Sequence, residues 1–374
     1  MKPSFCAIAN QQAGEDLIGT AGHYKAYVLI ECPMPWAAKV FDSKHIPSAL
    51  RDYIKAIKAE RSIQFLAVNR GVSSSSDTLT LMVYERTVPS SSVSSGHAPS
   101  DSIPSGGVSP VNDAIDGYRG YEFQLTGLSQ VVECLEAHWQ GDRIGKSITL
   151  QDILVCTHGM RDKCCARFGQ PFFREAIQSV RWGELPNTRV WKVSHIGGHR
   201  FAPTAISLPD GRYYGRLTLS ALQAMVTRRG PISQLRSVYR GWGLLPAPLQ
   251  VLERQLMLNY GWSWFEHKVT YQILEKGPQD SAGEASSHDV SSQRLRKGEL
   301  LVEMSVEPDA NQCKADGDTI TYRAKLYQDP QKSVCVRASC SSAIAKHFVK
   351  YTVADGVVVT SPQSAIVSET IAVT

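Results

Sequence analysis

The spacing of apolar residues along the first 140 positions predicts an α/β unit. It indicates strands at 27–30, 63–68, 79–84 and 121–125, and helices at 46–58 and 128–139. Within the first helix, Leu50, Ile54 and Ile57 recur at spacings of four and three, which is the period of an amphipathic helix. A strand followed by a helix and two further strands is typical of an α/β unit with a mixed sheet.

A second run of elements follows between residues 148 and 226. The pattern predicts strands at 148–155 and 187–193 around a helix at 168–180, then hairpin strands at 204–208 and 213–217 and a helix at 219–226. The tetrapeptide Pro-Asp-Gly-Arg at 209–212 is a strong turn signal for the hairpin. This order matches a thioredoxin-like lobe, and the first 140 residues resemble a degenerate form of it.

The chain length predicts more than one domain, because single cores rarely grow beyond about 250–300 residues, and this chain has 374. We expect an N-terminal α/β lobe at 1–140, a thioredoxin-like domain at 141–262 and a β-rich extension at 263–374. The extension contains alternating apolar runs at 300–306, 319–326 and 334–337, which predict strands. Polar, Ser- and Gly-rich segments at 88–113 and 276–298 predict flexible insertions, because they contain too few apolar side chains for burial to offset the entropy cost of ordering the chain.

Composition and the N-terminal sequence narrow the cellular setting. Charged residues make up 20% and hydrophobic residues 43% of the chain, which is typical of a folded protein. No run of about 18 apolar residues occurs, so we expect no membrane span. The first residues lack the apolar core of a secretory signal and the arginines of a transit peptide. We therefore expect a cytoplasmic protein.

Positive charge concentrates in one part of the chain. Residues 151–245 hold 14 Lys and Arg against 5 Asp and Glu, whereas the whole chain carries a net charge of only +5. A basic face can steer an acidic partner protein. The segment shows neither interleaved aromatic and basic residues nor a helix-turn-helix pattern, so we expect no nucleic-acid partner.

The cysteines gather in the same segment. Nine cysteines are an odd number spread over a long chain, which argues against a disulfide framework. Eight residues separate Cys156 from Cys165, and Cys164 is adjacent to Cys165. Because neighbouring side chains point in different directions, either Cys165 or Cys164 can face a shared metal with Cys156. The remaining cysteines have no histidine at a useful spacing, and we expect them to be structural: Cys6, Cys32, Cys134, Cys313, Cys335 and Cys340.

Two histidines, His195 and His199, lie about 30 residues beyond the cysteines. Gly197 and Gly198 between them would cost a helix about 2 kcal/mol relative to alanine, so the pattern favours a tight loop that can turn both imidazoles toward one point. A zinc protease motif would also need a glutamate after the first histidine, where this chain has Ile196. His158, close to Cys156, is expected to form hydrogen bonds near the site.

Thiols with imidazoles are the ligands of zinc sites and of mixed-ligand iron–sulfur clusters. Residue types alone leave both alternatives open, and a thiol-redox role for the adjacent cysteines is a third.

The motif Cys-x8-Cys followed by His-x-Gly-Gly-His resembles the sucrase/ferredoxin-like family, the bis-histidinyl thioredoxin-like ferredoxins. The segment Ala13–Gly22 and the tetrapeptide Pro33–Trp36 are also similar to the openings of family members. The resemblance implies a thioredoxin-like fold and a [2Fe–2S] cluster bound by Cys156, Cys165, His195 and His199. The family name suggests sucrose hydrolysis, but no convincing pair of carboxylates is visible, and we do not expect glycosidase activity.

The resemblance also implies electron transfer. Neutral imidazoles in place of two thiolates raise the reduction potential of a cluster, and their titration would make electron transfer pH-dependent. The nearby basic residues Arg161, Lys163, Arg167 and Arg200 are candidates for docking an acidic redox partner. The alternative is a zinc-stabilised thioredoxin-like binding module without redox activity. Whether the protein is also an enzyme stays open.

Overall fold

The structure is a computed structural model, and it describes residues 5–71, 78–87, 111–277, 295–296, 298–307, 319–354 and 358–360. The chain forms two compact units. Unit 1 comprises residues 1–86, 117–262 and 333–348, and unit 2 comprises residues 87–116, 263–332 and 349–374. Among the described residues, no helix combines the length and the apolar character needed to cross a bilayer.

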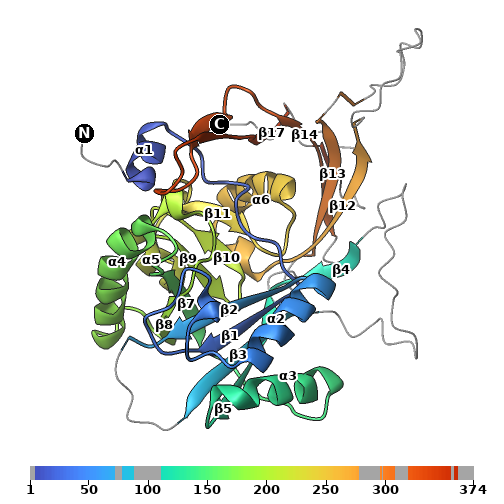
Figure 1. Cartoon of the computed structure of the whole chain (residues 1–374). Coiled ribbons are helices and arrows are strands. Elements are labelled where there is room, and N and C mark those ends of the chain that lie inside the picture. Colours follow the sequence, from blue (N-terminus) through green and yellow to red (C-terminus); the bar gives the residue numbers. More distant parts are fainter. Residues whose placement is uncertain are drawn as a thin grey trace, which may run out of the picture. The chain divides into compact units, whose positions relative to one another are not determined.

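A ten-stranded mixed sheet is the centre of unit 1 (Figure 1), in the order β11-β10-β9-β7-β8-β2-β1-β3-β5-β6. Its strands are β1 Ala26–Glu31, β2 Ile63–Asn69, β3 Leu79–Arg86, β5 Tyr118–Leu125, β6 Lys146–Ser147, β7 Gln151–Cys156, β8 Thr188–Val193, β9 Ala205–Leu208, β10 Arg212–Tyr214 and β11 Tyr239–Trp242. A separate hairpin pairs β15 Val334–Arg337 with β16 Ala345–Phe348.

The sheet contains the same four-strand topology twice. In the first half, β1 pairs in parallel with β2 and antiparallel with β3, which pairs antiparallel with β5. In the second half, β7 pairs in parallel with β8 and antiparallel with β9, which pairs antiparallel with β10. Each half thus has the strand order of a thioredoxin-like lobe. The predicted α/β fold class, a thioredoxin-like lobe preceded by a degenerate copy, is confirmed.

The two lobes join edge to edge. Val68 in β2 pairs antiparallel with Val193 in β8, so one sheet continues across both halves. Buried Asp152 in β7 adds a second connection: it accepts hydrogen bonds from Trp191 Nε1 at 2.7 Å and from the hydroxyl of Tyr84 in β3. Because of this shared sheet, the predicted boundary between 1–140 and 141–262 lies inside one compact unit.

The helices of unit 1 are α1 Cys6–Gln12, α2 Ser48–Glu60, α3 Val131–Gln140, α4 Lys163–Arg181, α5 Leu219–Thr227 and α6 Ala247–Tyr260. Short 3-10 helices occur at Val40–Asp42 (η1), Leu128–Gln130 (η3), His199–Phe201 (η4), Ile232–Leu235 (η5) and Gly261–Glu266 (η6). In Figure 1, α2 and α3 lie side by side, as do α4 and α5. The first pair covers a core that includes Val28, Leu50, Ile54 and Leu135. Each such side chain contributes about 1.5–3 kcal/mol by burial.

Helix α4 begins earlier than its apolar period predicts. The apolar period indicates a start at Phe168, whereas the helix starts at Lys163. The cause is Asp162, whose carboxylate caps the first turn by accepting a 2.8 Å hydrogen bond from the backbone N–H of Cys164. This capped first turn is the part of α4 that contains both adjacent cysteines.

Unit 2 is built on an antiparallel sheet of order β17-β14-β13-β12-β4, with β18 paired to β14. The strands are β4 Val111–Ile115, β12 Lys268–Lys276, β13 Leu300–Glu307, β14 Ile320–Gln328, β17 Tyr351–Val353 and β18 Val358–Thr360. The predicted strand at 334–337 exists, but it pairs in the β15–β16 hairpin of unit 1. The expected insertion at 88–113 ends inside β4, and its residues 88–110 lie outside the described residues, as do 278–294 and 297 of the second insertion.

Candidate metal centre

The predicted ligands lie at the ends of two neighbouring parallel strands. Cys156 is the last residue of β7, and His195 follows β8 by two residues. Cys165 is in the first turn of α4, the helix that connects these strands. The carboxyl ends of parallel strands are the usual position of binding sites in α/β sheets.

Close approach of α4 to β7 brings the two thiols together. A Cβ atom at Gly169 would lie 2.0 Å from the carbonyl oxygen of Cys156, so only glycine allows this packing. Both Cys156 and Cys165 are about 1% exposed. The Sγ atom of Cys165 is 3.7 Å from Nδ1 of His195, and the ligand atoms of Cys156, Cys165 and His195 all lie within 4.8 Å of one another.

The two histidines form a pair on one loop. His199 Nδ1 is 3.3 Å from His195 Nε2, and the ring centroids are 4.9 Å apart. His199 Nε2 contacts the carbonyl oxygen of Ala338, in the loop between β15 and β16, and so carries the proton of a neutral ring. Nδ1 of His199 therefore faces Nε2 of His195, whereas Nδ1 of His195 faces Cys165. His199 lies beside this group but outside the three residues whose ligand atoms converge within 4.8 Å. We call Cys156, Cys165, His195 and His199 the Cys/His centre.

The loop between the histidines depends on its two glycines. Gly197 and Gly198 have φ angles of +78° and +70°, in the left-handed region that side chains other than glycine rarely adopt. The predicted tight loop, in place of a helical pair of histidines, is thus what the structure shows.

A buried arginine fixes this loop. Arg240 donates hydrogen bonds to the carbonyl oxygen of Gly197 at 3.2 Å and to that of Thr20 at 2.6 Å. A Cβ atom at Gly198 would lie 2.6 Å from the Arg240 guanidinium, so the loop backbone packs directly against it. The side chain is 2% exposed, and burial lowers the pKa of Arg240 to about 10.

His158 supports the backbone at His195, as expected. Its Nδ1 accepts a hydrogen bond from the His195 N–H at 3.3 Å, and its Nε2 donates to the carbonyl oxygen of Ala37 at 2.8 Å. An accepting Nδ1 requires a neutral ring, and burial lowers the pKa of His158 and favours that form. His158 therefore positions the ligand loop without facing the other ligands.

The two thiols of the Cys/His centre differ in acidity. Hydrogen bonds from Cys165 and from His195 lower the pKa of Cys156, whereas donating to Cys156 and burial raise the pKa of Cys165. Cys156 is thus the thiol that ionises first. A metal bound by both sulfurs displaces the remaining proton from Cys165, because only thiolates ligate.

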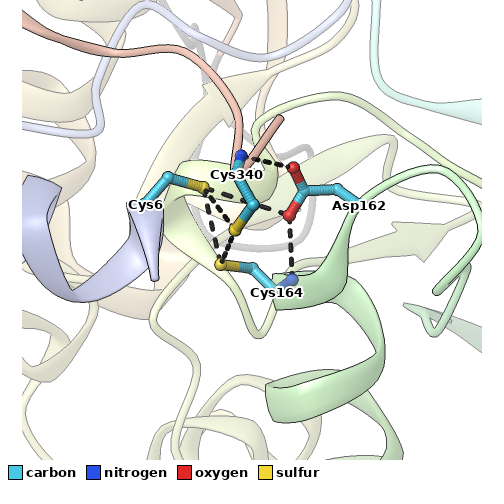
Figure 2. A group of neighbouring side chains, drawn as sticks. All are labelled: Cys6, Asp162, Cys164 and Cys340. Atoms are coloured by element: carbon cyan, nitrogen blue, oxygen red, sulfur yellow. Dashed lines mark hydrogen bonds between the residues drawn. The ribbon is translucent and has the colours of Figure 1, made fainter. Parts of the chain in front are cut away.

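The adjacent cysteines face different neighbours. Cys165 lies beside Cys156 and His195, whereas Cys164 lies 3.4 Å from Cys6 and 3.2 Å from Cys340, measured between sulfurs. Figure 2 shows these three thiols, which we call the three-thiol cluster, together with the carboxylate of Asp162. The alternative in which Cys164 replaces Cys165 beside Cys156 is not the arrangement of this structure.

Several contributors to the region were missed in the sequence. Cys6 and Cys340 were expected to be structural, and they lie far from Cys164 along the chain without any spacing motif. Asp162 had a visible signal, since Asp one residue before a helix is a frequent cap. Arg240 had no local signal, because it reaches the loop only through the fold. Cys313 lies outside the described residues.

Comparison with known proteins places these features in a family. Altered inheritance of mitochondria protein 32 from Meyerozyma guilliermondii (strain ATCC 6260) is 29% identical over 104 residues. These cover 26% of this chain and 36% of the relative, so the chain spans about a third of the relative's length. No solved structure matches the chain. The family model described as sucrase/ferredoxin-like matches residues 17–241, more than half of the sequence and all four residues of the Cys/His centre, so this chain belongs to the sucrase/ferredoxin-like family.

Proposed function

We propose that the protein transfers electrons through a [2Fe–2S] cluster bound by the Cys/His centre. The observation that carries the proposal is that two buried thiols, Cys156 and Cys165, converge with His195 at the ends of β7 and β8, with His199 paired to His195. When bound, such a cluster accepts and donates single electrons. Membership in a family described as ferredoxin-like supports the same function.

The residue types of the Cys/His centre and the tautomer of His199 both suit such a cluster. Two sulfurs and two imidazole nitrogens provide four ligand atoms, and the contact of Nε2 with Ala338 leaves Nδ1 of His199 free of that proton and directed toward His195. Neutral imidazoles leave the bound cluster less negative than four thiolates would, which raises its reduction potential.

The surrounding residues hold this geometry in place. Arg240 fixes the carbonyl of Gly197, and His158 fixes the N–H of His195. The buried positions of Cys156 and Cys165 keep water away from the sulfurs. Such fixed positions suit electron transfer, because little has to move when the charge changes.

We further propose an acidic redox partner that docks beside the centre. Arg161, Lys163 and Arg167 are exposed around the start of α4. Arg200 is less available, because both oxygens of Glu15 accept hydrogen bonds from it at 2.8 Å. Reversing the three exposed charges should slow electron exchange with an acidic donor and weaken its dependence on ionic strength. Rates that do not change would contradict docking at this face.

A cytoplasmic location is part of this proposal. Cysteines of the described residues are free thiols, and a reducing compartment keeps them so. Imaging of the full chain with a fluorescent tag tests it, and a signal confined to another compartment would contradict it.

Metal and sulfide analysis tests the cluster. Protein purified without oxygen should be coloured and contain about two iron and two acid-labile sulfide ions per chain. Cys165→Ser should lose most of both, since serine is a poor iron–sulfur ligand. Cys335→Ser is the matched control, because Cys335 is an exposed thiol on β15 and lies far from these ligands in the sequence. Wild-type protein without iron and sulfide would overturn the proposal.

A single zinc ion is a second candidate for this centre. The observation that favours it is that Cys156, Cys165 and His195 alone place their ligand atoms within 4.8 Å of one another, which suits one tetrahedral ion. The protein would then be a zinc-stabilised thioredoxin-like binding module. A colourless preparation in which Cys165→Ser removes one zinc ion and no iron would favour this candidate.

A further inference from the structure

We propose that the three-thiol cluster and Asp162 form a second metal site, which binds zinc. Three separate parts of unit 1 contribute to it. Cys6 is the first residue of α1, Asp162 and Cys164 lie at the start of α4, and Cys340 lies in the loop between β15 and β16. This site shares no ligand with the Cys/His centre and does not depend on the proposed electron transfer.

The sulfurs are spaced as zinc ligands are. The Sγ atoms are 3.4 Å apart between Cys6 and Cys164, 3.2 Å between Cys164 and Cys340, and 3.6 Å between Cys340 and Cys6. A tetrahedral zinc ion with zinc–sulfur distances of about 2.3 Å holds its sulfurs about 3.8 Å apart. The triangle therefore needs to widen by only a few tenths of an ångström to accept the ion.

Asp162 supplies the fourth corner. Its Oδ1 atom is 4.0 Å from Cys6 Sγ, and ligand atoms of all four residues lie within 4.8 Å of one another (Figure 2). The backbone N–H groups of Cys164 and Cys340 donate to its two oxygens at 2.8 Å and 2.9 Å. Each oxygen keeps a further lone pair, so the carboxylate is oriented and can still bind a cation.

The neighbourhood suits a metal thiolate better than plain packing of thiols. Asp162 is 4% exposed, its two backbone N–H donors keep the carboxylate ionised beside the sulfurs, and His199 Nε2 lies 3.8 Å from its Oδ2 atom. An ionised carboxylate next to three thiols is a donor set that zinc accepts. The backbone N–H of Ala7 donates to the sulfur of Cys164 at 3.4 Å, a contact that stabilises a thiolate. The three cysteines are free thiols, so no disulfide accounts for their meeting.

Such a site would fasten two segments to the thioredoxin-like lobe. Cys6 and Cys340 both lie outside the family-matched residues 17–241, whereas Asp162 and Cys164 lie within them. The clamped loop also contains Ala338, whose carbonyl oxygen contacts His199. Zinc at this site would thus hold in place the backbone that orients a residue of the Cys/His centre.

The test uses the full chain with the Cys/His centre disabled. The double variant Cys156→Ser/Cys165→Ser should lose iron and still bind about one zinc ion per chain. Adding Cys340→Ser should abolish tight zinc binding, whereas adding Cys335→Ser, in the same hairpin, should not. Asp162→Asn keeps a capping oxygen for α4, loses the charge, and should bind zinc at least 10-fold more weakly.

Two further measurements keep the proposal testable if a variant fails to fold. Cobalt(II) added to zinc-free protein of the double variant should give the intense visible bands of tetrahedral coordination and sulfur-to-cobalt charge transfer in the near ultraviolet. Zinc should also protect Cys6, Cys164 and Cys340 from alkylation, as read by mass spectrometry. Absence of zinc and of cobalt bands, or a disulfide among these three cysteines, would overturn the proposal. Loss of iron alone concerns only the Cys/His centre.

Discussion

At the scale of single residues, the site depends on the directions in which side chains point, and the spacing of residues in the sequence does not give these directions. Cys164 and Cys165 are neighbours, yet one lies beside Cys6 and the other beside Cys156, because successive residues of a helix point about 100° apart. The sequence predicted that only one of them would face Cys156. Which one depends on the start of α4, which is set by the Asp162 cap.

Gly198 provides a prediction at this scale. An alanine in the left-handed region costs about 1–2 kcal/mol. Gly198→Ala should lower the free energy of unfolding by more than this, because its Cβ would also lie 2.6 Å from the Arg240 guanidinium. It should also lower metal loading, which depends on the loop. Urea unfolding and metal analysis measure both effects.

Gly183→Ala is the matched control for that substitution. Gly183 has a φ angle of +75°, and nothing lies within 4 Å of its added Cβ, so only the backbone cost applies. Equal losses of stability in the two variants, with full metal loading in both, would contradict the proposed role of the loop.

At the scale of elements, apolar periods predicted most helices and strands but not all. The thioredoxin-like order was visible because its strands and helices are amphipathic or fully apolar. Helix α1 was missed, because its seven residues, Cys6–Gln12, show no clear helical period. The strand at 334–337 was predicted, but its pairing with β16 depends on a loop whose return no local pattern indicates.

The packing of α3 against β3 gives a prediction for pH dependence. His138 Nε2 lies 3.3 Å from a carboxylate oxygen of Glu85, and the interaction with this carboxylate raises the pKa of His138 above its usual 6.5. The resulting stability is fully present below the unfolded pKa and is lost as pH rises through the folded pKa. Glu85→Gln should therefore reduce stability at pH 5.5 more than at pH 8, as measured by urea unfolding.

A matched control for the pH effect is Glu133→Gln, an acidic residue in the first turn of α3. It should not change the pH dependence of the unfolding free energy around neutrality. If Glu85→Gln lowers the unfolding free energy equally at both pH values, the pair with His138 does not contribute as described.

At the scale of the whole molecule, one sheet contains two thioredoxin-like lobes. The sequence indicated both lobes, but not that Val68 pairs with Val193 to make the sheet continuous. Pairing between the edges of the two lobes leaves no periodic signal in the sequence. An edge strand has the same apolar pattern whether or not it pairs with a strand of the other lobe. The three-thiol cluster was equally invisible, because Cys6 and Cys340 meet Cys164 only after the chain has folded.

The proposed electron transfer depends on His195 and His199 as ligands of a redox cluster. Pulsed electron paramagnetic resonance of the one-electron-reduced protein, labelled with ¹⁵N-histidine, measures this most directly. Bound through His195 and His199, the cluster should show coupling to two histidine nitrogens, and His199→Cys should show one together with a lower reduction potential. A reduced protein without histidine coupling, or one without a paramagnetic signal, would contradict the account.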